Sequence, residues 1–142
     1  MAYEKIVKRF YDELENGKIM AKKCPRCGAV DYPPRIICNS CGNLETNWIE
    51  IKGDAEVTNV FLPAMMSTLP QNEVFQPYGL GSVLLAEGAE VNAIICGVTR
   101  KNLPAIQAKL AAGEKVPVKT KIAARDGYSM VVFELTESYE EA

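Results

Sequence analysis

Four cysteines in two close pairs are the residues of this sequence best suited to chemistry. Cys24 and Cys27 belong to one C-x-x-C-G segment, Cys38 and Cys41 to a second, and ten residues separate the two segments. Two such turns direct four thiolates to one point, which suits a tetrahedral metal ion, and each trailing glycine lets the backbone bend back. The pattern predicts a structural Zn²⁺ site in a zinc ribbon. A rubredoxin-type iron site and a pair of disulfides are the alternatives.

The chain contains no histidine. This excludes Ser–His and Cys–His nucleophile pairs, and it excludes histidine as a metal ligand. The fifth cysteine, Cys96, lies in the apolar segment 94–98 and has no histidine to activate it, so we expect it to act as a small buried apolar residue. No catalytic residue is therefore predicted in this chain.

Length and charge limit the possible functions further. The 142 residues are enough for one average domain or two small ones, and the net charge of −2 argues against non-specific binding of nucleic acid. The first residues lack the apolar segment of a signal peptide, and no apolar run is long enough to span a membrane. We expect a cytoplasmic protein whose thiols stay reduced and available to metal.

Residues 3–16 have the periodicity of an amphipathic helix, which Asn16 and Gly17 end. Its apolar stripe includes aromatic side chains and either packs within the chain or docks on a partner protein. A zinc ribbon has little core with which to cover such a stripe, which favours the partner. The residues predicted to bind a partner are Tyr3, Phe10 and Tyr11 of the helix and Pro33, Pro34 and Arg35 between the cysteine pairs.

Residues 18–52 form the predicted ribbon, which is too short to fold without metal. The segment 32–35 reads Tyr-Pro-Pro-Arg, and its prolines predict an extended arm between the two cysteine turns. Arg35 is either a surface charge or an anchor for an acidic partner. The alternation in 48–51 then predicts a strand that leaves the ribbon.

The remainder, 53–142, has the pattern of a small β-barrel. Strands are predicted at 55–62, 80–86, 91–99, 115–125 and 128–136, with a helix at 104–112. Five strands with a helix between the third and fourth are the element order of an OB-fold, and another barrel or a sandwich is the alternative. The predicted fold is therefore mainly β, with an N-terminal helix (1–17), a rubredoxin-like zinc ribbon (18–52) and a five-stranded OB-fold barrel with one inserted helix (53–142).

The order of these motifs resembles a family of zinc-ribbon and OB-fold proteins associated with acyl-CoA metabolism. The resemblance covers nearly the whole chain. It rests on the aromatic-rich helix, the two C-x-x-C-G segments with 32–35 between them, Gly53, Pro77–Tyr78 and Glu87–Gly88. Members of this family resemble small partner subunits of thiolase-fold enzymes, including thiolases, hydroxymethylglutaryl-CoA synthase and side-chain aldolases. The insert at 103–113 is longer than expected of the family.

Two further surfaces are candidates for binding. Four cations of the fourth predicted strand fall at odd positions and therefore on one face: Lys115, Lys119, Lys121 and Arg125. This face is either simply solvated or a patch for acyl-CoA phosphates or an acidic partner; it lacks the aromatic residues on which nucleic-acid bases stack.

The long connection 63–79 is the second candidate surface. Its apolar residues suit an acyl-CoA entrance or a partner contact, or they fold over a barrel end: Met65, Met66, Phe75 and Tyr78.

The sequence and the resemblance together predict a non-catalytic, zinc-binding subunit in a hetero-oligomer with a thiolase-fold catalytic subunit. That subunit would supply the nucleophilic cysteine and the histidine bases. The alternatives are an OB-fold module that binds acyl-CoA or single-stranded nucleic acid, and an iron electron carrier of rubredoxin type.

Overall fold

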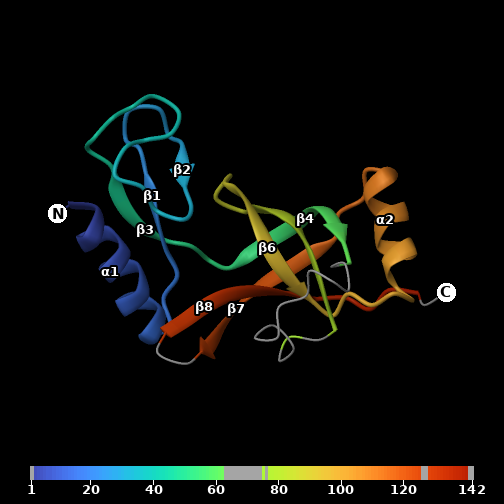
Figure 1. Ribbon diagram of the computed structural model, residues 1–142. Helices are drawn as coiled ribbons and strands as arrows, with labels where there is room; N and C mark the ends of the chain where they lie inside the picture. The colour runs from blue at the N-terminus through green and yellow to red at the C-terminus, as the bar shows by residue number, and fades with distance from the viewer. Residues whose placement is uncertain (1, 63–74, 76, 126–127, 141–142) are drawn as a thin grey trace.

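The computed structural model describes residues 2–62, 75, 77–125 and 128–140. It confirms the predicted fold class: an N-terminal helix and a small three-stranded sheet lie on one side of a closed five-stranded barrel, and a second helix lies on the other (Figure 1). Among the described residues, no helix combines the length and apolarity that crossing a membrane requires.

Helix α1 (Ala2–Glu15) packs on both the small sheet and the barrel, through strands β1 (Met20–Lys23) and β8 (Tyr128–Leu135). It ends as predicted at Gly17, whose φ of 80° suits glycine and whose N–H donates to the carbonyl of Leu14 at 3.0 Å. The Leu14 side chain is only 2% exposed. The C-terminal half of the helix is therefore anchored within the chain.

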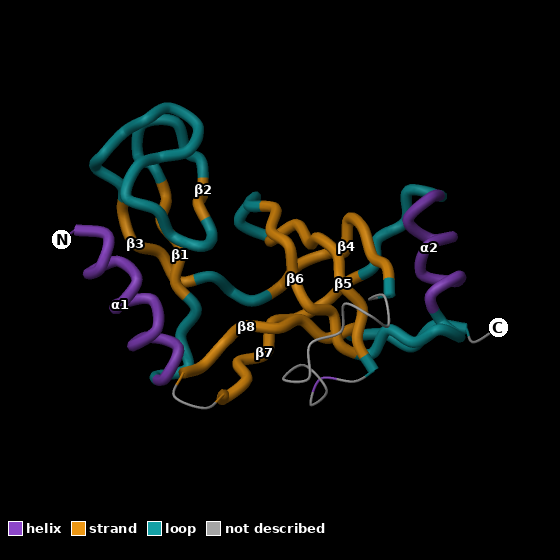
Figure 2. Tube along the Cα trace, viewed as in Figure 1, coloured by secondary structure: helices purple, strands orange, loops and turns teal. Residues whose placement is uncertain are grey.

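The ribbon sheet has β1 at its centre, between β2 (Val30–Asp31) and β3 (Asn47–Glu50), and both pairings are antiparallel. Loops make up the rest of the ribbon (Figure 2). Bends at 32–33 and 36–37 interrupt the predicted extended arm. Pro33 and Pro34 lack the N–H groups that would continue a strand ladder beyond β2.

Trp48 of β3 joins helix α1 to the ribbon sheet. The guanidinium of Arg9 lies 4.8 Å from the centre of the indole ring, and the ammonium of Lys22 lies 5.2 Å from it. Such cation–π contacts are worth about 0.5–1 kcal/mol at partly exposed sites. Because Arg9 is on the helix and Lys22 on β1, the indole fixes the helix against the sheet.

The barrel is an OB-fold. Its strands are β4 (Asp54–Phe61), β5 (Tyr78–Leu85), β6 (Glu90–Cys96), β7 (Pro117–Arg125) and β8. They close in the order β4-β5-β6-β8-β7, and the one parallel pairing joins β6 to β8 through Ile95 with Phe133 and Cys96 with Glu134. The alternation predicted for the fourth barrel strand holds around its start, where Val116, just before the strand, and Val118 are buried and Lys119 is exposed.

Three predicted strand limits were wrong by two or three residues. Strand β5 begins at Tyr78, two residues before the predicted start at Leu80. Strand β6 ends at Cys96, because Gly97, with φ of 95°, turns the chain before Thr99. Strand β7 begins at Pro117, so Lys115 lies in the connection before it.

Helix α2 (Leu103–Ala111) is the predicted insert and closes one end of the barrel. Ile106 is fully buried, and the side-chain amide of Gln107 donates to the carbonyl of Val60 at 3.2 Å. Asn102, just before the helix, is buried; its side-chain oxygen accepts from the N–H of Thr99 at 2.7 Å, and its NH₂ donates to the carbonyl of Gly97 at 2.9 Å. These bonds hold the end of β6 to the start of α2.

One cluster of buried apolar residues runs from the helix and ribbon into the barrel. It includes Leu14, Ile19 and Ile51 together with Val83 and Ile106. The division into units 1–17, 18–52 and 53–142 remains a prediction, because the cluster crosses both predicted boundaries.

Leu14→Ala should lower the free energy of unfolding by about 2–5 kcal/mol, since it leaves a cavity in this shared cluster. Val7→Ala, on the same helix at a side chain that is 47% exposed, should change it by no more than about 0.5 kcal/mol. Urea unfolding of the zinc-loaded chain measures both. Equal effects would show that the helix is not anchored through its C-terminal half.

Candidate functional site

The four cysteines predicted to bind metal converge in the ribbon. Their sulfur atoms all lie within 4.8 Å of one another. The Sγ atoms of Cys24 and Cys41 are 3.6 Å apart, and those of Cys27 and Cys38 are 3.5 Å apart. A Zn–S bond of about 2.3 Å in a tetrahedron places the sulfurs about 3.8 Å apart, so one ion fits between them.

The same distances exclude disulfides in this arrangement. A disulfide requires about 2.05 Å between sulfurs, and all four cysteines are free thiols. When Zn²⁺ is bound, these residues supply all four ligands, which leaves no open position for substrate and makes the site structural.

The two cysteine turns have the same backbone hydrogen bonds. Gly28 donates its N–H to the carbonyl of Cys24, and Gly42 donates to that of Cys38, both at 2.9 Å. Both glycines have φ of 78°, which favours glycine. The side-chain NH₂ of Asn43 donates to the Cys24 sulfur at 3.5 Å, a contact that the sequence pattern did not predict and that orients this thiolate.

The sulfur pKa values show why the set needs a cation. Burial raises the pKa of Cys24, but the N–H of Cys27 and the Asn43 amide outweigh it and bring that pKa to about 6. The N–H of Ala29 lowers the pKa of Cys27, but the adjacent sulfur of Cys38 raises it to about 12. The Cys24 thiolate forms easily, whereas the neighbouring sulfurs, that of Cys38 first, oppose ionisation of Cys27. A divalent cation shared by the four sulfurs would offset that opposition.

A groove of about 570 Å³ lies between the N-terminal half of α1 and the segment 34–39. We call it the helix–ribbon groove. It is lined by Ile6, Val7, Pro34, Arg35, Ile36, Ile37, Cys38, Asn39 and Gly42. Val7 and Ile37 are 47% and 48% exposed. Cys38 is both a predicted metal ligand and part of the groove, so the metal site fixes one wall.

The residues predicted to bind a partner lie in different places in the structure. Pro34 and Arg35 line the helix–ribbon groove. Phe10 is half-buried and its ring contacts Tyr32 edge-on, with 5.9 Å between centroids, inside the chain. Tyr11 is 42% exposed, and Pro33 lies with it at the junction with the barrel. The side chain of Tyr3 lies outside the described residues.

The residues predicted for the acyl-CoA entrance are not brought together by the described structure. Met65 and Met66 lie outside the described residues. Tyr78 begins β5 and is only 5% exposed, so it is a packing residue. Phe75 is half-buried and lines a cavity of about 330 Å³ with Cys96.

The predicted cation patch is partly neutralised by acidic neighbours. The ammonium of Lys121 lies 3.0 Å from a carboxylate oxygen of Glu134. Lys119 pairs in register with Asp54 on one side and Glu134 on the other. Lys115 precedes the strand, and the side chain of Arg125 is not described. The described residues therefore do not form a continuous cationic face.

Cys96 lies on β6 and is partly buried, in agreement with the expectation of a packing role. Burial raises the pKa of its thiol, and the carboxylate of Glu134 raises it further, while Lys121 acts in the opposite direction. A raised pKa leaves less thiolate at neutral pH, which opposes a nucleophilic role.

Four apolar residues that line the helix–ribbon groove are absent from the predicted partner surface: Ile6, Val7, Ile36 and Ile37. Ile36 and Ile37 are consecutive apolar residues in a loop just before a cysteine turn, and Val7 stands on the predicted stripe. An Ile-Ile pair in a short loop before a metal-binding cysteine turn, of which Ile37 is exposed and Ile36 partly buried, is the signal that indicates a contact surface.

Removal of a metal ligand should unfold the ribbon. Cys38→Ser removes one of the four ligands and should abolish retention of one zinc per chain. The ribbon then loses the binding free energy, on the order of 10 kcal/mol, that structural zinc supplies at neutral pH. Cys96→Ser should keep the metal. Metal analysis of the purified variants measures both, and zinc retained by Cys38→Ser, or a red iron-loaded wild type, would contradict the assignment.

In the zinc-loaded chain, alkylation of Cys96 should be slower at pH 8 than that of an unhindered cysteine. The rate should rise as pH approaches the raised pKa, because only the thiolate reacts. Glu134→Gln should speed the reaction at pH 8, since it removes a negative charge and frees Lys121. Glu90→Gln, on strand β6 like Cys96, is the control and should leave the rate of alkylation unchanged. Iodoacetamide kinetics followed by mass spectrometry measure these rates.

Comparisons with known proteins agree with this architecture. No curated protein matches the chain significantly. The structure is similar to a chain of a solved complex described as "Ltp2-ChsH2(DUF35) aldolase", with a TM-score of 0.68, 19% sequence identity, and coverage of 92% of this chain and 94% of that chain. It is also similar to a DUF35-family protein of unknown function from Sulfolobus solfataricus, with a TM-score of 0.56, 18% identity, and coverage of 92% and 84%. At these identities the matches show a shared fold.

The ribbon itself matches a family model. Residues 12–46 match the model described as "ChsH2, rubredoxin-like zinc ribbon domain". The match spans all four converging cysteines and therefore favours zinc over the alternative iron site. Residues 12–46 of this chain thus form a zinc ribbon that is similar to the rubredoxin-like zinc ribbon domain of ChsH2.

Proposed function

We propose that this chain is a non-catalytic, zinc-binding subunit of an acyl-CoA enzyme whose catalytic subunit has a thiolase fold. In the most specific form of the proposal, that enzyme is benzoylsuccinyl-CoA thiolase of anaerobic toluene degradation, whose small subunit the chain resembles. The zinc ribbon and helix α1 dock on the catalytic subunit, and the barrel lies near the acyl-CoA entrance.

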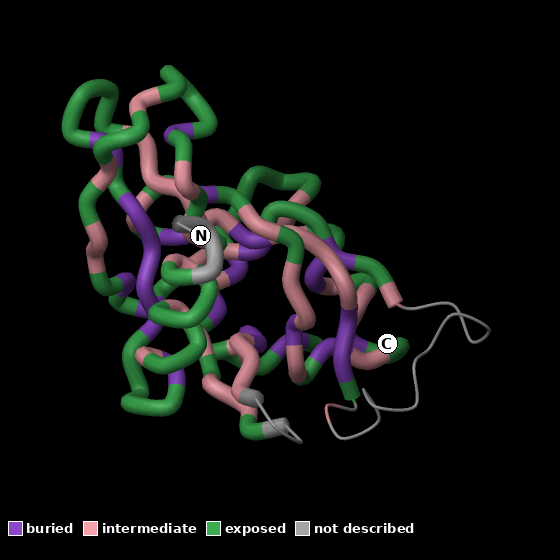
Figure 3. Tube along the Cα trace, turned by 60° about the vertical axis from the view of Figure 1, so that its left-hand side comes forward, coloured by how far each residue is buried: buried purple, intermediate pink, exposed green. Residues whose placement is uncertain are grey.

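The helix–ribbon groove is the observation that carries the proposal. The loops around it are largely exposed (Figure 3). Its walls present Val7 and Ile37, each about half exposed, and exposed apolar side chains that line one groove are typical of a protein interface. The groove is held by the metal site on one side and by the anchored helix on the other, so its shape exists before a partner binds.

Charge indicates what the partner presents. Arg35 is exposed and is the one charged side chain among the described residues that line the groove. An apolar segment with one carboxylate would fill the groove and pair with the guanidinium. The catalytic subunit must also supply the reacting groups, because this chain has no histidine and its four-cysteine site has no open position.

The comparisons support an assembly with a second component. One of the similar structures, the Ltp2-ChsH2(DUF35) aldolase, combines ChsH2 with Ltp2. By analogy with that aldolase, we propose a second component for this chain as well.

Co-purification from the native cell tests the partner. The tagged, zinc-loaded chain should retain a protein that mass spectrometry identifies as a thiolase-fold acyl-CoA enzyme. The reconstituted pair should turn over an acyl-CoA substrate that neither chain turns over alone. A monomeric chain, or a stable partner of another class, would overturn the proposal.

Substitutions in the groove test the interface. Val7→Asp and Ile37→Asp should each weaken assembly by at least about tenfold, because a buried unpaired carboxylate costs more than about 1.4 kcal/mol. Phe61→Asp is the matched control, since Phe61 is 49% exposed and lies on the barrel. It should leave assembly unchanged. Size-exclusion chromatography with calorimetric titration measures the three variants, and equal losses for all of them would contradict docking at the groove.

A further inference from the structure

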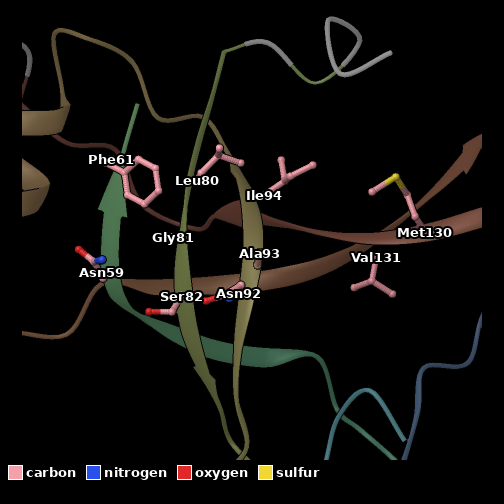
Figure 4. A pocket seen from close by; sticks show the side chains of 10 residues that line it. All are labelled: Asn59, Phe61, Leu80, Gly81, Ser82, Asn92, Ala93, Ile94, Met130 and Val131. Carbon is pink, nitrogen blue, oxygen red and sulfur yellow. The ribbon is translucent and has the colours of Figure 1, made fainter. Parts of the chain in front are cut away.

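The outer face of strands β4, β5 and β6 has a hollow of about 500 Å³ that the proposed interface does not use. Two rows of side chains cross it, because residues in register on neighbouring strands lie side by side (Figure 4). The apolar row consists of Phe61, Leu80 and Ile94, and the polar row consists of Asn59, Ser82 and Asn92. We call this surface the two-row face.

The polar row has hydrogen-bonding groups to offer a ligand. Within the described part of the chain, no hydrogen bond engages the side-chain amides of Asn59 and Asn92, and both residues are exposed. Each amide can donate two bonds and accept others. The hydroxyl of Ser82 lies 2.6 Å from that of Thr58 and keeps acceptor capacity. The apolar row is also open, since Phe61 is 49% exposed.

The two-row face is uncharged. None of the described residues that line the hollow carries a charge. Next along the same strands, Glu56 and Glu90 both pair in register with Leu84, so the flank beyond the polar row is acidic. A phosphodiester chain needs cations along its path, and a single phenylalanine gives little stacking surface for bases. The chemistry therefore favours a neutral ligand.

The hollow continues towards the ribbon. Asn92, Ala93, Met130 and Val131 also line a second cavity of about 170 Å³. This second cavity opens between β6 and β8 because the two strands pair at only two positions. The far end of this cavity is walled by aromatic rings of the helix and ribbon: Phe10, Tyr11 and Tyr32. The complete site is elongated and becomes apolar at one end.

We infer that the two-row face binds the pantetheine arm of an acyl thioester. This arm is elongated and uncharged; its two amides and hydroxyl suit the polar row, and its alkyl branch suits the apolar row. Its acyl end points towards the aromatic cavity. The hollow has the size of a small-molecule site, and β5, at its centre, is paired along both edges, so no peptide strand can be added there. The choice of an acyl thioester within this ligand class rests on the proposed function.

An NMR titration of the full zinc-loaded chain, without any partner, tests the inference. The probe is S-hexyl-pantetheine, a thioether that cannot transfer an acyl group. Saturable shifts are expected for backbone amides at 59–61, 80–82 and 92–94. Asn92→Leu should weaken binding about fivefold through a lost hydrogen bond. Asn47→Leu, at an exposed asparagine on β3 outside the face, is the control and should leave binding unchanged.

Several results would overturn the inference. One is the absence of saturable shifts on these strands; another is equal affinity for 1-hexanol, which would mean that the polar row contributes nothing. Salt-sensitive binding of oligo-dT at the same residues would assign the face to nucleic acid, and shifts induced there only by the purified catalytic subunit would assign it to protein. Because no partner is present in the titration, failure here leaves the assembly result intact, and failed assembly leaves this binding measurable.

Discussion

The crowding of four sulfur atoms within 4.8 Å of one another is the constraint on which the rest of the ribbon depends. Thiolates this close repel one another unless a cation is shared, and the raised pKa of Cys27 beside Cys38 expresses that repulsion. A ribbon of two- and four-residue strands has no core large enough to substitute for the metal. The bends before Cys38, and with them one wall of the helix–ribbon groove, keep their shape because Cys38, at the end of that loop, belongs to the metal site.

Helix α1 connects this metal-dependent part to the barrel, and its two halves have different environments. Leu14 is buried in the shared apolar cluster, whereas Val7, two turns earlier, is about half exposed beside the groove. The sequence analysis offered two alternatives for the whole stripe, packing within the chain or docking on a partner. The structure shows internal packing for the C-terminal half and leaves the other half open to the proposed partner.

Local signals in the sequence were sufficient for most of the fold. Gly17 and Gly113 mark the helix ends, and the alternation of Val116 and Val118 with Lys119 marks the inner face of a strand. The cysteine spacing predicted the metal site because the turn itself brings the sulfurs together. The strand limits at Gly97 and Pro117 failed by a few residues, since an apolar run does not show where its backbone turns.

Features that depend on pairing between distant segments could not be predicted. The ion pair of Lys121 with Glu134 requires the register of β7 against β8, and it weakens a cation patch that looked continuous in the sequence. The two-row face depends on the register of three strands and on the irregularity between Val57 and Asn59. The sequence alone does not show which residues that are far apart along the chain share a surface.

The cluster of buried residues that crosses from ribbon to barrel has a thermodynamic consequence. Ile19 and Ile51 lie in the same cluster as Val83 and Ile106, so unfolding of the ribbon would expose part of the apolar surface that the barrel buries. A ligand that binds only the folded state stabilises it by mass action, in proportion to the logarithm of its free concentration. Zinc supply therefore acts on the whole chain: in a zinc-starved cell, the barrel would lose stability although no metal touches it.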